Sequence, residues 1–182
     1  MKKRIIALGL LWCLSAVMLQ AARVDTVLVR SAAMNKDVKV VYVLPDKAIG
    51  KQACPVVYLL HGYGGNARSW VQLKPELPQM ADEKGIIFVC PDGKNSWYWD
   101  SPENPAYRYE TFVTSELVKY TDGNYATIPD RKARAISGLS MGGHGALWSA
   151  IRHKDVFGAA GSMSGGVDIR PFPQNWEMNK QL

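Results

Sequence analysis

The sequence predicts an α/β fold built on a mostly parallel β-sheet with an antiparallel edge at its N-terminal side. Two observations carry this prediction. Short unbroken apolar runs, typical of strands buried on both faces of a parallel sheet, alternate along the chain with stretches of helical period. The alternation of strand and helix implies right-handed crossovers between parallel strands. The 182 residues, 47% apolar and 21% charged, suit one soluble domain.

The first 22 residues have the layout of a secretory signal peptide. Residues 2–4 are basic, residues 5–19 are apolar except for a glycine and a serine, and residues 20–22 offer small side chains for cleavage. A membrane anchor is the alternative, but about 15 apolar residues fall short of the ~20 that span a bilayer. We therefore expect a secreted or periplasmic protein with no stable membrane insertion after cleavage, and a folded domain over residues 23–182.

Charge and histidine content argue against two other classes of function. Three of the six net positive charges lie in residues 2–4, and the remaining basic residues are scattered among acidic ones, so no nucleic-acid partner is expected. The three histidines form no H-x-x-x-H pattern, and the cysteines form no C-x-x-C pattern. We expect neither a metal site nor a cofactor.

The strands are predicted from β-branched and apolar runs. Two such runs flank a polar connection at residues 35–37 and are expected to pair antiparallel at the sheet edge, over residues 24–30 and 38–44. Three further runs should be parallel strands, over residues 55–60, 86–90 and 133–136. Residues 158–162 follow in the same alternation, but they are too rich in small side chains for propensity alone to assign them.

Three helical stretches are expected between the strands. Residues 70–83 contain two prolines and should be broken. Residues 111–120 should form a firmer helix that Asp122 and Gly123 close. Residues 143–153 carry their apolar side chains on one side and should form the third helix.

Cys54 and Cys90 remain after the leader is removed. Export makes a disulfide chemically possible. However, Cys54 precedes one predicted strand and Cys90 ends another, which separates the sulfurs by roughly 15 Å if the strands are parallel neighbours. We expect two buried free thiols.

Residues 138–142 read Gly-Leu-Ser-Met-Gly and lie between a predicted strand and a predicted helix. In this context G-x-S-x-G is the nucleophile elbow of the α/β-hydrolase three-layer sandwich. The turn strains the serine backbone, and glycines two residues before and after leave room where a Cβ would collide. Ser140 is thereby held above the sheet at a helix N-terminus, whose dipole favours developing negative charge. A serine-capped turn is the alternative interpretation.

Residues 61–65 read His-Gly-Tyr-Gly-Gly and directly follow the first predicted parallel strand. Acyl transfer needs hydrogen-bond donors aimed at the oxyanion of the tetrahedral intermediate. We assign the first donor to the backbone N–H of Tyr63, with Gly64 as the alternative, and the second to that of Met141. A plain turn between strand and helix is the competing interpretation.

Five motifs in this order resemble the esterase D-like family: HGYGG, VCPDG with NSWYWD, GLSMGGHGAL, RHKDVFG and GSMSGG. That family contains feruloyl and acetyl-xylan esterases, S-formylglutathione hydrolases and bacterial mycolyltransferases, and the similarity spans about residues 38–166. The resemblance implies Ser140 as nucleophile, with Tyr63 and Met141 as the oxyanion hole. It also implies that residues 95–100 form the rim of the acyl or leaving-group pocket. Trp97 and Trp99 there either stack on a sugar or aromatic ring or serve packing.

The partners of the serine are not found in this chain. A triad runs Ser, then Asp or Glu, then His. His144 lies in the elbow helix and His153 near its far end, and His61 is expected to prop the oxyanion loop, so none is expected to be the base. The family's acid and histidine come further along than Leu182. Either the domain is incomplete at its C-terminus, or the chain is a shortened homologue that has lost catalysis. Both interpretations predict poor ester hydrolysis, and the last strand would be an unprotected edge that lowers solubility.

These observations favour an exported serine carboxylesterase that works through an acyl-serine intermediate. The expected partner is a small acyl ester or an acylated oligosaccharide, with feruloyl or acetyl groups on plant polysaccharide as the leading substrates. An acyltransferase of the same fold is one alternative, because the two activities differ only in whether water or a sugar hydroxyl reaches the acyl-enzyme. A non-catalytic carbohydrate-binding fragment is the other.

Overall fold

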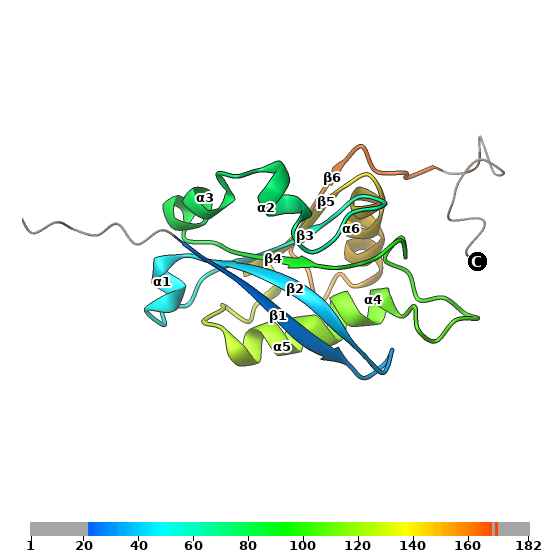
Figure 1. Cartoon of the computed structure of the whole chain (residues 1–182), viewed down its shortest axis with the longest axis horizontal. Helices are drawn as coiled ribbons and strands as arrows, with labels where there is room; N and C mark the ends of the chain where they lie inside the picture. Colours follow the sequence, from blue (N-terminus) through cyan, green and yellow to red (C-terminus); the bar gives the residue numbers. More distant parts are fainter. Residues whose placement is uncertain (1–21, 169, 171–182) are drawn as a thin grey trace, which may run out of the picture.

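The protein folds around a six-stranded sheet with the strand order β1-β2-β4-β3-β5-β6 (Figure 1). The computed structural model describes residues 22–168 and 170, so the predicted leader lies outside the described residues except for Ala22. The strands are β1 (Arg23–Ser31), β2 (Lys36–Leu44), β3 (Val56–Leu60), β4 (Ile87–Pro91), β5 (Arg134–Leu139) and β6 (Ala159–Met163).

The directions of the strands confirm the predicted mixed sheet. β1 pairs antiparallel with β2, and β2 pairs antiparallel with β4. The central pairs β4–β3, β3–β5 and β5–β6 are all parallel. The small-residue run that propensity left open is the strand β6, which lies at the edge of the sheet with most of its residues exposed. Neighbouring β5 supplies its pairing, which is a tertiary effect that propensity does not contain.

Helices cover both faces of the sheet and make three layers (Figure 1). Alternate residues of β2 point to opposite faces. Val41 and Val43 pack with α2 (Ser69–Leu73) and α3 (Leu77–Lys84), whereas Val40 and Tyr42 belong to the cluster on the other face. That second face is covered by α4 (Tyr109–Thr111), a π-helical turn (Phe112–Glu116), α5 (Leu117–Asn124) and α6 (Met141–Arg152). Two short elements complete the fold, α1 (Asp46–Ile49) and a 3₁₀ turn (Arg131–Ala133).

The helices lie at the predicted positions in the sequence, but their first and last residues differ from the predicted ones. The predicted break in residues 70–83 is confirmed by the separate helices α2 and α3. The next helix runs unbroken from Tyr109 to Asn124, so the prediction that Gly123 closes it is wrong. A helical glycine costs about 1 kcal/mol relative to alanine. The buried side chains of Leu117, Val118 and Thr121 offset that cost by packing this helix on the sheet.

Cys54 and Cys90 are both free and buried, as predicted. β3 and β4 are parallel neighbours with Val56 opposite Ile87. Cys54 therefore precedes one end of the pair and Cys90 lies towards the other. Burial raises the pKa of the Cys90 thiol to about 12, so this thiol stays protonated at neutral pH. Within residues 22–168 and 170, no helix has both the length and the apolar character needed to cross a membrane.

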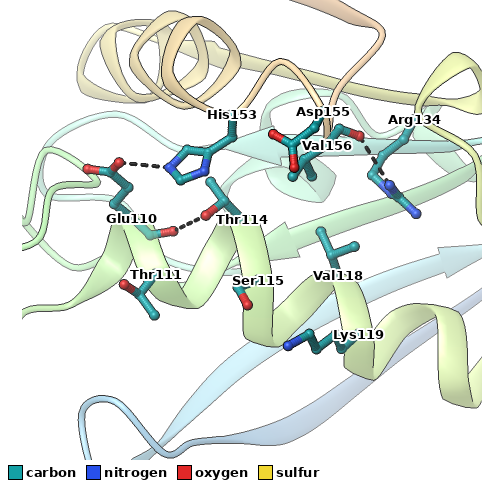
Figure 2. A pocket seen from close by; sticks show the side chains of 10 residues that line it. All are labelled: Glu110, Thr111, Thr114, Ser115, Val118, Lys119, Arg134, His153, Asp155 and Val156. Atoms are coloured by element: carbon teal, nitrogen blue, oxygen red, sulfur yellow. Dashed lines mark hydrogen bonds and ion pairs between the residues drawn. The ribbon is translucent and has the colours of Figure 1, made fainter.

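Glu110 ties the start of the α4–α5 helix to the end of α6. Its carboxylate accepts hydrogen bonds from Trp148 Nε1 and Arg152 Nε, both at 2.7 Å. It also lies 2.8 Å from His153 Nε2 (Figure 2). A cavity of about 570 Å³ lies beside it, between this helix and residues 153–156. Burial alone would raise the pKa of Glu110, but the bonds from Arg152, Trp148 and His153 outweigh burial and hold that pKa below its ordinary value.

Glu110→Gln is therefore expected to lower the free energy of unfolding by about 2 kcal/mol at pH 7, because it removes charge-assisted hydrogen bonds. The folded-state pKa is depressed, so the carboxylate stabilises the fold above its ordinary pKa of ~4.3, and this stabilisation is lost as the pH falls. Urea unfolding should show the gap between wild type and variant shrinking from about pH 5 to pH 3. Glu103→Gln at an exposed position is the matched control. A gap that stays constant with pH would contradict this assignment.

Candidate active site

Ser140 lies in a sharp turn between β5 and α6, at the edge where the parallel strands end. Its backbone angles are φ 54° and ψ −116°, a region that residues other than glycine rarely adopt. Such a conformation costs about 1–3 kcal/mol and is typical of functional positions. The Ser140 N–H donates to Met163 O at 2.8 Å, and the residue is exposed. The turn therefore presents the hydroxyl to solvent at the start of α6.

The two glycines of the elbow are required by close backbone contacts. A Cβ at Gly138 would lie 2.2 Å from Gly142 O, and a Cβ at Gly142 would lie 2.1 Å from Leu60 O. Both distances are far below any real carbon–oxygen contact, and in both cases the obstacle is backbone. The spacing of these glycines around Ser140 thus has the steric origin that the sequence predicted.

The loop after β3 passes directly beside Ser140. A Cβ placed on Gly62 would lie 3.6 Å from Ser140 Cβ. The Gly64 N–H already donates to Asn95 Oδ1 at 2.8 Å, which removes the alternative oxyanion donor. No hydrogen bond among the described residues engages the Tyr63 N–H. Met141 is the first residue of α6, so its N–H has no acceptor within the helix.

His61 fixes the loop over residues 61–65 through hydrogen bonds of its ring and its backbone. Its imidazole is buried, with Nδ1 2.7 Å from Gly62 O and Nε2 accepting the Gly93 N–H at 2.9 Å. The backbone of His61 bonds to the hydroxyl of Tyr98, which accepts the His61 N–H at 2.9 Å and donates to the His61 carbonyl at 3.3 Å. His61 therefore holds the loop over residues 61–65 in place.

The loop over residues 93–100 contains the two tryptophans expected at the pocket rim. Trp97 and Tyr98 have φ of 54° and 60°, so two successive bulky residues adopt the left-handed conformation. Trp97 is only 6% exposed and belongs to the core, which favours the packing interpretation for this residue. Trp99 is partly exposed. The fully buried Tyr98, which reaches back to His61, is a site residue that the sequence analysis did not identify.

Each of the three imidazoles in the sequence bonds away from Ser140. His61 contacts Gly62 and Gly93, His153 contacts Glu110, and His144 lies between Trp99 Nε1 and the carbonyl of Gly166. Each ring thus has a hydrogen-bond partner other than the Ser140 hydroxyl, and that none of them is the base stays a prediction. In residues 22–168 and 170 no group of three or more His, Cys, Asp or Glu side chains could hold a metal ion.

The sheet order, the strained Ser140 and the glycine loop beside it together define an α/β-hydrolase. A family model described as "Putative esterase" matches residues 31–181, so the chain belongs to this esterase family. The family resemblance stated from the motifs is thereby confirmed.

Three related proteins show how widely this family varies. The chain is 28% identical over 135 residues to an acetyl esterase of Caldicellulosiruptor saccharolyticus, covering 70% of this chain and 50% of that one. It is 34% identical over 155 residues to the diacylglycerol acyltransferase/mycolyltransferase Ag85A of Mycobacterium gordonae, covering 80% and 43%. The solved structure of a ferulic acid esterase superposes with a TM-score of 0.70 at 31% identity, covering 80% and 61%. The chain spans half or less of the length of these two curated relatives.

Proposed function

We propose that the protein is an exported serine carboxylesterase with Ser140 as its nucleophile, acting on feruloyl or acetyl esters of plant polysaccharide or oligosaccharide. The observation that carries the proposal is the exposed Ser140 in a strained turn, next to the loop that contains Tyr63 and directly before Met141 at the start of α6. Relatives named as acetyl esterase and ferulic acid esterase support the choice of ester. The basic and apolar leader sequence supports export to the periplasm or medium.

The reaction proceeds in two halves. Ser140 Oγ attacks the ester carbonyl carbon, and the carbonyl oxygen becomes an oxyanion that the N–H groups of Tyr63 and Met141 bind. The tetrahedral intermediate expels the alcohol and leaves an acyl-serine. Water then attacks the acyl carbon, and the carboxylic acid leaves with Ser140 restored. The serine proton passes to a base other than His61, His144 and His153, since each of these bonds elsewhere. This base then protonates the leaving alcohol oxygen, takes a proton from the attacking water and returns it to Ser140 Oγ.

A second candidate activity is acyl transfer to a sugar hydroxyl instead of water. The observation that favours it is the 34% identity with a protein named as an acyltransferase/mycolyltransferase. Both activities use the same serine and the same oxyanion donors. Incubation of the acyl-enzyme with a sugar acceptor, followed by mass spectrometry of the products, distinguishes an acylated sugar from free acid.

A fluorophosphonate probe tests the proposal, because this reagent reacts with serine hydroxyls that an enzyme has activated. The protein expressed from its full reading frame is expected to be labelled, and peptide mapping should place the label on Ser140. Ser140→Ala should lose the label, whereas the exposed Ser164→Ala should keep it. Absence of label on the folded protein would reject the esterase.

A further inference from the structure

His144 connects the nucleophile elbow to the partly exposed tryptophan of the loop over residues 93–100. Its backbone N–H donates to Ser140 O at 3.0 Å, so the residue lies in the first turn of α6. Its ring accepts the Trp99 Nε1–H at Nε2, at 2.5 Å. Its Nδ1 lies 2.9 Å from Gly166 O, in the segment that follows β6. One imidazole thus joins three segments that meet beside the serine.

These two hydrogen bonds specify the neutral form of the ring. Nδ1 must carry the proton to donate to the Gly166 carbonyl, and Nε2 must be unprotonated to accept the indole N–H. Burial lowers the pKa of His144, and the bond to Gly166 O offsets only part of this effect. The ring also lies 5.4 Å from Trp99 and 6.0 Å from Trp148, stacked on the latter at 16°.

The charged groups on the surrounding elements are engaged elsewhere. The carboxylate of Asp100, next to Trp99, bonds to Thr111. Glu110, beside Trp148, bonds to Arg152 and His153. Asp168, two residues after Gly166, pairs with Arg170. Within residues 22–168 and 170, no carboxylate hydrogen-bonds to the His144 ring, so its contact with Trp99 is a neutral hydrogen bond.

We propose that His144 is a positioning residue that holds the Trp99 indole as one wall of the ester site, and that this wall recognises a ring in the substrate. The indole N–H is committed to His144, and Trp148 packs against the ring at 5.6 Å and 30°. Trp99 therefore offers the substrate only the apolar surface that these contacts leave free. Such a surface suits an aromatic acyl group such as feruloyl, or the apolar face of a sugar, and gives nothing specific to a small acyl group. This inference rests on the proposed function.

Kinetics of the full protein test this role. His144→Leu should raise KM for methyl ferulate about 10-fold, the cost of one hydrogen bond, with kcat changed less than about 3-fold. KM for ethyl acetate, which has no ring, should stay unchanged. His144→Gln places an acceptor oxygen near the position of Nε2 and should restore the low KM. In a Trp99→Phe background, His144→Leu should have no further effect, because the bond is already lost.

Acidification provides a second readout. Protonation of His144 at Nε2 would place an N–H opposite the Trp99 indole N–H and break the hydrogen bond between them. The KM of the wild type for methyl ferulate should therefore rise at acid pH. The KM of His144→Gln should not change with pH. The NMR signal of the Trp99 indole N–H, assigned with Trp99→Phe, should shift in the same pH range, also in the inactive Ser140→Ala protein.

Three outcomes would overturn the inference: a fall in kcat with KM unchanged, the same KM rise for ethyl acetate, or an indole signal insensitive to His144→Leu. Failure of the proposed function is read separately, from an absent fluorophosphonate label on wild-type protein.

Discussion

The 182-residue chain by itself is expected to hydrolyse an activated ester about 10⁶-fold more slowly, in kcat, than an α/β-hydrolase with a complete triad. The reason is the placement of its imidazoles. The Nε2 of His61 accepts a backbone N–H, that of His144 accepts an indole N–H, and that of His153 bonds to Glu110. Without a base, the Ser140 hydroxyl keeps its proton and is a weak nucleophile.

This expectation has a sharp internal test, because triad residues act as a unit. When the base is missing, removing the serine costs little more, and the oxyanion donors alone retain about 10³–10⁴ over water. Ser140→Ala in the 182-residue chain should therefore change the rate of 4-nitrophenyl acetate hydrolysis by less than about 10-fold. A larger drop would show that a base is present, and replacement of each histidine in turn by glutamine would identify it.

Gly142→Ala is expected to lower the free energy of unfolding by more than about 4 kcal/mol, at the upper limit for a single substitution. The added methyl would lie 2.1 Å from Leu60 O and 2.7 Å from His61 O. Neither carbonyl can move without breaking β3 or the oxyanion loop. The variant should either unfold at a much lower urea concentration or refold the elbow with Ser140 displaced, and in both cases lose the fluorophosphonate label.

The matched control is Gly123→Ala in α5. Nothing lies within 4 Å of a Cβ at Gly123, and its φ is not positive. Here alanine should stabilise the protein by about 0.5–1 kcal/mol, because it reduces the freedom of the unfolded chain and suits a helix. Equal effects of the two substitutions in urea unfolding would contradict the steric account of the elbow.

The features that could be predicted from sequence are those that short segments of the chain determine. The parallel strands follow from apolar runs, and the elbow follows from five successive residues whose glycines are required by local sterics. The roles of Tyr98 and His144 could not be predicted in this way. Their partners are 37 and 45 residues away, and only the packed sheet brings them together. A pattern of period 2 or 3.6 carries no information on such contacts.

Two further features of the structure could not be predicted from the residue types. Trp97 and Trp99 look equivalent in sequence, and only the left-handed turn at residues 97 and 98 buries the first and leaves the second partly exposed. The helix end expected at Gly123 was displaced because packing on the sheet outweighs the local cost of glycine. Backbone conformation thus decides which tryptophan of this loop is buried and which is partly exposed, and the residue types alone do not reveal it.

The division of the loop over residues 93–100 into a buried and an exposed part has a consequence for how new specificities arise. Asn95 and Tyr98 hydrogen-bond to the backbone of Gly64 and His61, whereas the partly exposed Trp99 bonds to His144 on α6. In the proposed esterase, mutations that change substrate choice can therefore accumulate at Trp99 while its neighbours keep the loop beside Ser140 in place. Such separability allows descendants of one ancestral scaffold to diversify towards different esters without rebuilding their chemistry.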